Sequence, residues 1–165
     1  MNSKARVYIK KLQLKKHPEG GYYREVYRSG EKILSDHLPH RYKSSRNFST
    51  SIYFLLEGNQ YSAFHQLKSD ELWHFYDGSD LKVYIINPEG NLTVAKLGRS
   101  DDAEFQIAVE KDCWFAAEVE DKKSFSLFGC TVSPGFEFED FKLGKREFLI
   151  IKFPKHNTLI QTLTR

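Results

Sequence analysis

The chain has 165 residues, a net charge of +3 and 15% aromatic residues. This length predicts a single domain with its own hydrophobic core. The charges are interspersed and no basic run occurs, so nucleic acid is not the expected partner. No apolar stretch is long enough to cross a membrane and no signal segment stands at the N-terminus, so we expect a cytoplasmic protein with no membrane partner.

The first fifty residues hold a helical pattern, a strand pattern and a polar loop. Residues 5–16 carry Tyr8 and Leu12 between lysines, which predicts a short amphipathic helix that covers a sheet. Residues 22–29 alternate in the manner of a β-strand. Residues 30–47 are polar and contain a proline, which indicates a long surface loop of the kind that often acts as a lid.

The rest of the chain predicts closely spaced strands and then two short helices, at residues 145–152 and 156–163. Regular short strands separated by turns are typical of a sandwich or barrel. The eight strands are expected at residues 48–56, 61–67, 71–76, 81–87, 92–97, 105–109, 113–118 and 124–132. Cys113 and Cys130 lie in these apolar stretches, so buried thiols are expected rather than a disulfide or a metal pair.

The stretch of residues 58–78 carries the most chemistry. It contains His65, Glu71 and His74, with an apolar strand on either side. A histidine and a carboxylate held between strands suit acid–base chemistry or metal binding.

This stretch resembles the first motif of the cupins, which runs Gly, His-x-His, Glu, Gly. Gly58, His65, Glu71 and Gly78 occupy the corresponding places, with a first gap that is one residue longer. Leu67 stands where the cupins have their second histidine, and the second cupin motif has lost its named residues in VEKDCWF. Of the four usual metal ligands of the superfamily, two therefore remain.

The segments HPEGGYYRE, SDELWHFYDG, WFAAEV and CTVSPGFEFEDF together resemble the cupin-5 family, or domain of unknown function 985, of the RmlC-like cupin superfamily. The resemblance covers nearly the whole chain. It implies an all-β fold, a jelly-roll barrel (double-stranded β-helix), with a short N-terminal helix and two short C-terminal helices. Residues 1–165 would form a single cupin domain, and the family implies a homodimer, but no agreed reaction.

A weaker resemblance links the chain to dTDP-keto-sugar 3,5-epimerases. Residues 20–25 fit the early motif of those enzymes except for its arginine, and His65 stands at the place of their catalytic base. Their general acid, a tyrosine, follows a Cys-Thr pair, whereas Cys130-Thr131 is followed here by Val-Ser-Pro. The base position is thus kept and the usual acid is absent.

From these patterns we assign three candidate catalytic residues. His65 would be the base, because histidine titrates near neutral pH. Glu71 would orient or stabilise the substrate, and Tyr23 would replace the missing acid. The candidate ligand-binding residues are polar or aromatic side chains near this stretch or on neighbouring strands: Arg24, Glu25, Arg46, Thr50, Ser62, Trp73, Phe75, Gln106 and Trp114.

Simpler structural roles stand beside these assignments. His65 could be satisfied by hydrogen bonds inside a barrel, and Glu71 could pair with an arginine and only stabilise the fold. Strand parity places His74 on the opposite face from Glu71, where a packing role is expected. We therefore predict no metal cofactor, and keep a divalent metal ion on His65, Glu71 and His74 as the alternative.

The sequence thus predicts a cupin that binds a small molecule of the sugar or nucleotide type. If it is an enzyme, proton transfer next to a carbonyl, as in an isomerase or epimerase, is the expected reaction. The alternatives are a metal-dependent cupin enzyme and a non-catalytic ligand sensor or scaffold.

Overall fold

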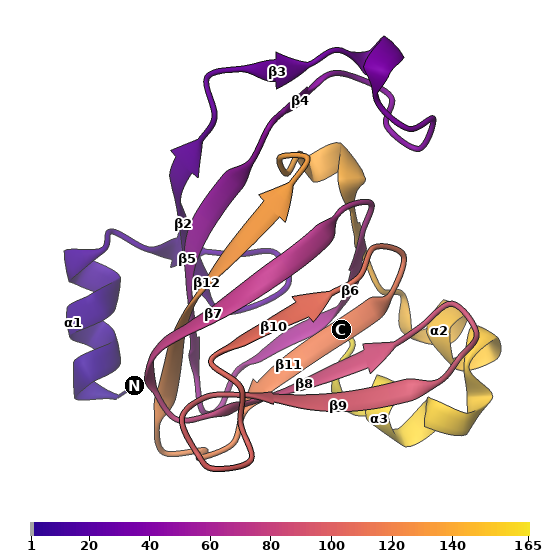
Figure 1. The fold of residues 1–165 in the computed structure, drawn as a ribbon. Coiled ribbons are helices and arrows are strands. Elements are labelled where there is room, and N and C mark those ends of the chain that lie inside the picture. Colours follow the sequence, from indigo (N-terminus) through magenta and orange to yellow (C-terminus); the bar gives the residue numbers. More distant parts are fainter. Residues whose placement is uncertain (1) are drawn as a thin grey trace.

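The computed structural model describes residues 2–165, which form two facing antiparallel sheets flanked by three short helices (Figure 1). The larger sheet has six strands. In spatial order they are β1 (Lys15–Lys16), β2 (Tyr22–Arg28), β5 (Thr50–Glu57), β12 (Phe125–Ser133), β7 (Asp70–Gly78) and β10 (Gln106–Val109).

The second sheet has five strands and the top of the molecule carries a small hairpin. In spatial order the five strands are β13 (Phe141–Leu143), β6 (Tyr61–Leu67), β11 (Trp114–Val119), β8 (Leu81–Ile86) and β9 (Leu92–Leu97). The hairpin pairs β3 (Lys32–Ile33) with β4 (Arg46–Asn47), and a 3-10 turn, η1 (Ser35–His37), lies between them. The chain crosses repeatedly between the sheets, since β5, β7, β10 and β12 belong to one and β6, β8, β9 and β11 to the other.

The main core lies between the two sheets and is rich in aromatic rings. Phe128 is stacked on both sides, with ring centroids 5.1 Å from Phe54 and 4.7 Å from Trp73. These rings come from β5, β7 and β12, where every second side chain points inward. Each buried ring removes a large apolar area from water, so this stack joins the three central strands of the larger sheet.

The helices cover the outer faces of the sheets. Helix α1 (Ser3–Lys11) packs through Ala5 on the outer side of β5 and β12, and Asn2 caps its N-terminus. Helices α2 (Arg146–Lys152) and α3 (Asn157–Thr162) cover the outer face of the five-stranded sheet, and a 3-10 turn, η3 (Pro154–His156), separates them. Within the part of the chain that the structure describes, no helix is both long and apolar enough to cross a membrane.

The structure confirms the predicted order of elements and corrects their details. The helix expected at residues 5–16 ends at Lys11, because Gln13 adopts a positive φ of 53° and the following residues pair with β2. The eight predicted strands are present with ends shifted by at most two residues. The hairpin inside residues 30–47, the short strand β13 and a 3-10 turn before it, η2 (Phe138–Asp140), were not predicted.

A β-bulge in β2 changes which side chains face the interior. The pairing with β5 shifts between Glu25 and Tyr27. As a result Arg28 pairs with Thr50 and lies on the same face as Tyr23 and Glu25, although simple alternation would place it on the opposite face.

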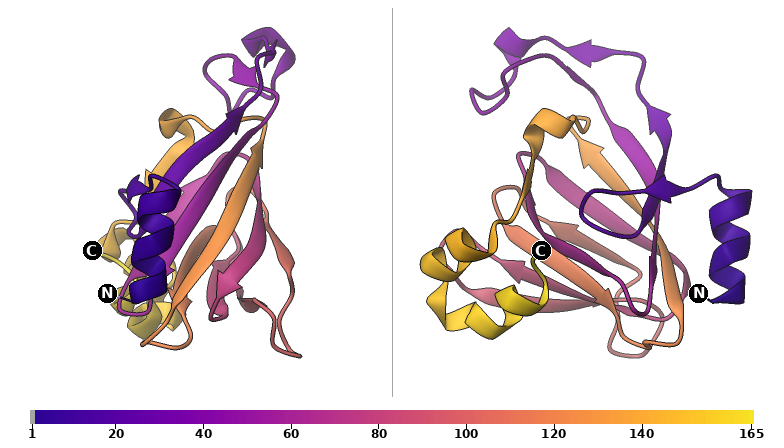
Figure 2. Two further views of the ribbon diagram at one scale, coloured as in Figure 1. Left: turned by 90° about the vertical axis from the view of Figure 1, so that its left-hand side faces the viewer. Right: turned by 180° about the vertical axis from the view of Figure 1, so that it is seen from behind.

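The turn between β1 and β2, residues 17–21, joins the two sheets. It is closed by a hydrogen bond from the His17 amide to the Gly21 carbonyl, and the Ala63 amide of β6 donates to the Glu19 carbonyl at 2.9 Å. Figure 2 (right) shows this segment reaching from α1 across the back of the molecule before it returns into β2. The turn therefore ties an edge of the six-stranded sheet to a strand of the other sheet.

We predict that Gly21→Ala destabilises the protein, because Gly21 has φ +71° and an added Cβ would lie 2.7 Å from the Leu55 carbonyl oxygen. Left-handed backbone and overpacking together should cost about 2 kcal/mol or more in the free energy of unfolding, measured by urea denaturation. Gly30→Ala is the matched control, since no atom lies within 4 Å of its added Cβ. Equal stabilities of the two variants would contradict this role of the turn.

Candidate functional site

A cavity of about 310 Å³ lies between the sheets, at the end that the turn of residues 17–21 closes. Its lining combines four buried or largely buried titratable side chains with apolar and aromatic walls. The titratable side chains are His17, Glu19, His65 and Glu71. Such a combination of apolar walls and a few polar groups is typical of small-molecule sites.

Glu19 is the central polar group of the cavity. One carboxylate oxygen, Oε1, accepts a hydrogen bond of 2.7 Å from the buried Ser62 hydroxyl. The other, Oε2, lies 3.2 Å from His65 Nε2 and 3.4 Å from His17 Nδ1. A buried carboxyl group is costly unless it is hydrogen-bonded. Ser62 and His65 are the partners of this group, and His17 lies beside the oxygen that His65 contacts.

The tautomer of His65 follows from its backbone contact. Nδ1 lies 2.8 Å from the Ala63 carbonyl oxygen, which can only accept, so Nδ1 carries the hydrogen. In the neutral ring Nε2 then presents a lone pair to Glu19 Oε2, and a favourable contact requires one proton between the two atoms. Burial raises the pKa of Glu19 and lowers the pKa of His65, so the neutral acid donating to a neutral imidazole is the favoured state.

His17 lies on the other side of Glu19. Its Nδ1 faces the Glu19 amide at 3.4 Å, and its ring packs edge-on against Tyr23 at 4.6 Å and against Phe54 at 5.5 Å. Burial lowers the pKa of this imidazole, and the nearby His65 adds to the lowering. His17 is therefore a neutral ring among aromatic side chains.

Glu71 is the second buried carboxyl group. The indole Nε1 of Trp73 donates to its Oε2 at 2.8 Å. Burial raises the pKa of Glu71 to about 7, against an ordinary value of 4.5. The thiol of Cys130 lies beside it, and burial raises the pKa of that thiol well above its usual range, so the thiol is a neutral part of the wall.

The mouth of the cavity is lined by charged side chains that are largely paired with one another. Arg28 binds Glu25 through Nη2 at 2.8 Å and Glu137 through Nη1 at 2.7 Å. Arg24 donates to the Leu12 carbonyl at 3.0 Å. The bulge in β2 is what brings Arg28 to this mouth.

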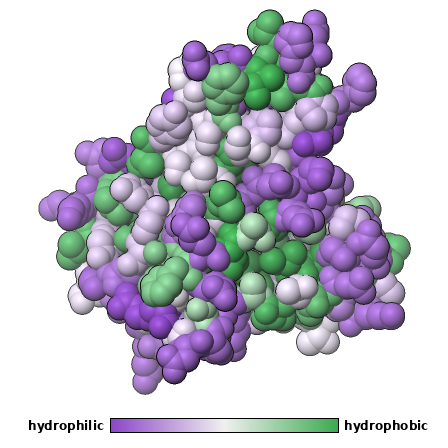
Figure 3. Space-filling model, in the orientation of Figure 1, coloured by the Kyte–Doolittle hydropathy of each residue, from purple (hydrophilic) through white to green (hydrophobic). Residues whose placement is uncertain are grey.

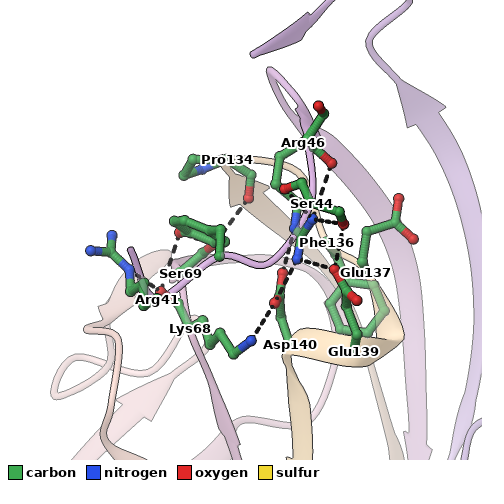
Figure 4. Close-up of polar contacts among 12 residues, drawn as sticks. Arg41, Ser44, Arg46, Lys68, Ser69, Pro134, Phe136, Glu137, Glu139 and Asp140 are labelled. Carbon is green, nitrogen blue, oxygen red and sulfur yellow. Dashed lines mark hydrogen bonds and ion pairs between the residues drawn. The ribbon is translucent and has the colours of Figure 1, made fainter. Parts of the chain in front are cut away.

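One wall of the cavity is the segment that follows β12, residues 134–141, and a buried ion-pair network holds it in place (Figure 4). Arg46 binds both oxygens of Asp140, at 2.6 and 2.8 Å, and Lys68 lies 3.1 Å from Asp140 Oδ1. Ser69 donates to the Pro134 carbonyl at 3.1 Å. The network links β4 to this wall across more than ninety residues of sequence.

The structure brings most of the sequence-predicted site residues to this cavity. Its lining includes all three candidate catalytic residues, His65, Glu71 and Tyr23. It also includes four candidate binding residues: Arg24, Glu25, Thr50 and Trp73. Ser62 lies behind Glu19 and acts on the cavity only through that carboxyl group.

Five predicted residues lie elsewhere. Arg46 is fully buried in the network of Figure 4, so it cannot clamp a phosphate as expected. Phe75 packs in the core with its ring under Arg99. Gln106 is exposed on β10, and Trp114 is buried under α2 and α3 on the outer face of the second sheet. His74 faces outward, as parity predicts, with Nε2 3.2 Å from the Thr131 hydroxyl.

Sequence analysis did not single out His17, Glu19 and Arg28. The first two stand in the segment HPEGG, whose two glycines both adopt positive φ and form the tight turn. The signal in the sequence was a tight turn, indicated by a proline and two glycines, that holds a histidine and a glutamate. The position of Arg28 depends on a bulge that no sequence pattern shows.

The cupin metal ligands do not fit this cavity. Leu67 and Phe115 are buried apolar residues at or beside places where the superfamily has histidines, and both nitrogens of His65 already have partners. His74 lies on the other face of β7 and cannot complete a site with His65 and Glu71. Among residues 2–165, no group of three or more His, Cys, Asp or Glu side chains has an arrangement that could hold a metal ion.

Comparisons with known proteins identify relatives over the whole chain. The family model described as "Cupin superfamily (DUF985)" matches residues 6–144. A crystal structure of a protein from Shewanella oneidensis is 40% identical, with a TM-score of 0.87 over 100% of this chain and 98% of that chain. A hypothetical protein from Leishmania major is 29% identical, with a TM-score of 0.87 over 99% of each chain.

A more distant structure shares the fold alone. Oxalate decarboxylase from Bacillus subtilis is 15% identical, with a TM-score of 0.56 over 90% of this chain and 36% of that chain. These neighbours agree with the all-β, cupin-like fold predicted from the sequence, whose strands lie in two facing sheets here. No curated protein matches the chain.

We predict that the free energy of unfolding of the wild type, minus that of the Glu71→Gln variant, decreases as the pH rises. In the folded protein Glu71 keeps its proton up to a pKa of about 7, whereas in the unfolded chain it loses the proton near 4.5. Between these values the folded state binds more protons, so the contribution of this group to the free energy of unfolding decreases with pH, by an amount on the order of 3 kcal/mol. Glutamine keeps an oxygen for the Trp73 indole and does not titrate.

Urea denaturation of both proteins at about pH 4.5 and about pH 8 measures the difference, because these two pH values span the reference and the shifted pKa of Glu71. Glu89→Gln, at an exposed position, is the control and should follow the wild type at both pH values. A difference between wild type and Glu71→Gln that does not change with pH would show that Glu71 titrates normally.

Proposed function

The chain belongs to the cupin-5 family of the cupin superfamily (DUF985), and we propose that its cavity binds a small polar molecule of the sugar or nucleotide type. The observation that carries this proposal is the group of buried titratable side chains beside apolar walls in one cavity. Its volume of about 310 Å³ suits a small metabolite. The walls offer ring faces from Tyr23, Phe136 and Phe141, on which a sugar or a base can stack.

We further propose that any reaction in this cavity is a proton transfer next to a carbonyl group, as in an isomerase or epimerase. Glu71 supports this, because a carboxyl group with a pKa of about 7 exists in both protonation states near neutral pH. Tyr23 lies in the same lining and offers a phenol group. His65 belongs to the same cluster, but it contacts Glu19 and the backbone of Ala63.

Two alternatives remain as proposals of lower rank. A non-catalytic ligand sensor would use the same cavity and is distinguished by binding without conversion of the ligand. A metal-dependent enzyme would need metal ligands in this cavity. Both ring nitrogens of His65 already have partners, and His74 lies on the other face of β7. The proposed function is therefore formulated without a metal cofactor.

We also propose that the protein is a cytoplasmic homodimer. Both cysteines are unpaired and buried, which fits a reducing compartment. On the outer side of β7, Leu72 and Tyr76 are 45% and 47% exposed, and Phe105 beside β10 is 65% exposed. Figure 3 shows hydrophobic residues gathered near the middle of the face drawn there, in the region of β10 and its neighbours, with hydrophilic residues around them. A second copy of the chain would cover such a surface.

The dimer is tested by light scattering on the purified protein, with Tyr76→Lys as the variant. We expect a mass of two chains for the wild type and of one chain for Tyr76→Lys, because a buried lysine opposes association. Phe148→Lys changes an exposed ring of α2 that packs beside Trp114, and this control should stay dimeric. A wild-type mass of one chain would contradict the dimer.

The binding function is tested by a thermal-shift screen with nucleotides, sugar nucleotides and keto-acids. A compound at a hundredfold excess over its Kd should add about 2.7 kcal/mol of stability and raise the Tm. The shift should be lost in Glu71→Gln and kept in His74→Asn, which changes the opposite face of the same strand. A shift that survives in Glu71→Gln would place the binding site outside this cavity, and no shift with any compound would contradict the proposed ligand class.

A further inference from the structure

The two histidines of the cavity differ in how many ring nitrogens remain free. His65 uses both: Nδ1 donates to the Ala63 carbonyl at 2.8 Å and Nε2 contacts Glu19 at 3.2 Å. Its ring is also covered by Phe115, at a centroid distance of 4.0 Å, and by Phe141 at 5.5 Å. Neither nitrogen can contact a ligand without first losing a hydrogen bond.

His17 has one nitrogen engaged and one open. Nδ1 faces the amide and the carboxyl group of Glu19, both at 3.4 Å. Among residues 2–165, no side chain or backbone group forms a hydrogen bond with Nε2, and the ring lines the cavity. Because Nδ1 lies opposite an N–H donor, it holds the lone pair, and the open Nε2 carries the hydrogen.

Glu71 is also partly open to the cavity. Trp73 Nε1 is the single N–H or O–H donor that reaches this carboxyl group in the described chain, and it binds Oε2. A carboxyl group can accept several hydrogen bonds, so Glu71 keeps capacity for a ligand.

We infer that His17 Nε2 and the Glu71 carboxyl group are the two polar groups that contact the ligand, and that His65 is a positioning residue that acts through Glu19. This inference rests on the proposed binding function and deepens it. Glu19 is the physical link, since one of its oxygens contacts both imidazoles. His65 thereby helps to fix the rotamer of Glu19. When that rotamer is released, the carboxyl group can accept a hydrogen from His17 Nδ1, in competition with the Glu19 amide that donates to the same nitrogen.

The arrangement specifies the chemistry of the ligand. An N–H donor at His17 requires an acceptor oxygen, such as a carbonyl or hydroxyl oxygen. Glu71 can accept from a hydroxyl group or, when protonated, donate to a second oxygen. The apolar rings of Phe54 and Phe136 in the same lining suit the face of a ring. The ligand class is therefore a compact ring or chain with two oxygens, of which at least one is an acceptor.

The assignment of the histidines can be tested in the free protein. Diethyl pyrocarbonate acylates an accessible imidazole nitrogen that holds a lone pair. His17 therefore reacts at Nε2 once the ring hydrogen has moved to Nδ1, where the Glu19 carboxyl group can accept it, and peptide mass spectrometry gives the rate at each histidine. We expect His17 to react at least about tenfold faster than His65, the factor that corresponds to one lost hydrogen bond. His37 and His40, exposed on the loop before β4, provide the internal reference for full reactivity. An unreactive His17, or equal rates at His17 and His65, would overturn the assignment.

The positioning role needs a second measurement. Nitrogen-15 spectra of the imidazole side chains at slightly alkaline pH should show His17 protonated at Nε2 and His65 at Nδ1. In a His65→Asn variant that keeps a cooperative thermal transition, we expect His17 to become a mixture of tautomers, while His74→Asn leaves it unchanged. A His17 tautomer that does not respond to His65→Asn would reduce His65 to a packing residue and overturn its proposed role.

These outcomes are separate from those of the ligand screen. If no compound in the screen stabilises the protein, the proposed binding function fails, while the labelling and the spectra still decide which nitrogen faces the cavity. If a compound does bind, His17→Phe should abolish its thermal shift, because phenylalanine keeps a ring at this place but offers no donor.

Discussion

The structure depends on one constraint above all: the buried Glu19 must be held by hydrogen bonds. Its backbone carbonyl binds the Ala63 amide, and its side chain reaches Ser62 and both histidines of the cavity. An unsatisfied carboxyl group at this depth would cost several kcal/mol, so the turn, β6 and the imidazoles must be placed together. The same contacts that hold the turn against the second sheet also define one end of the cavity. Fold and site therefore share one set of hydrogen bonds.

The cavity also places two carboxyl groups and two imidazoles in an environment that disfavours charge. Burial raises the pKa values of Glu19 and Glu71 and lowers those of His17 and His65. These shifts favour the neutral form of each of the four groups. A site in this state can donate and accept hydrogen bonds without carrying net charge. That property favours ligands whose recognised groups are themselves neutral, while the charged mouth is largely neutralised by its own ion pairs.

Sequence analysis predicted the strands, the family and several residues that line the cavity, and it failed where the answer depended on contacts across the chain. Alternation along β7 was enough to separate Glu71 from His74, because strand parity is a local property. Glu19 could not be recognised in this way, since its partners Ser62 and His65 follow more than forty residues later. Arg46 was assigned to ligand binding because the sequence of a polar loop does not distinguish an exposed arginine from a buried one. Its burial depends on the ion pair with Asp140, which follows 94 residues later.

The ion pairs and hydrogen bonds that hold the cavity together connect residues far apart in the chain. Arg46 and Asp140 are 94 positions apart, and Arg165 reaches the Glu19 carbonyl across 146 positions. A pocket built from such distant pieces has a high contact order, so it should form slowly, after the local hairpins. During synthesis the binding site would then be completed only when the last strands and helices have joined the sheets. Occupancy of the cavity would in this way report that the whole chain is folded, and a nick in the wall segment would remove binding even where most of both sheets survives.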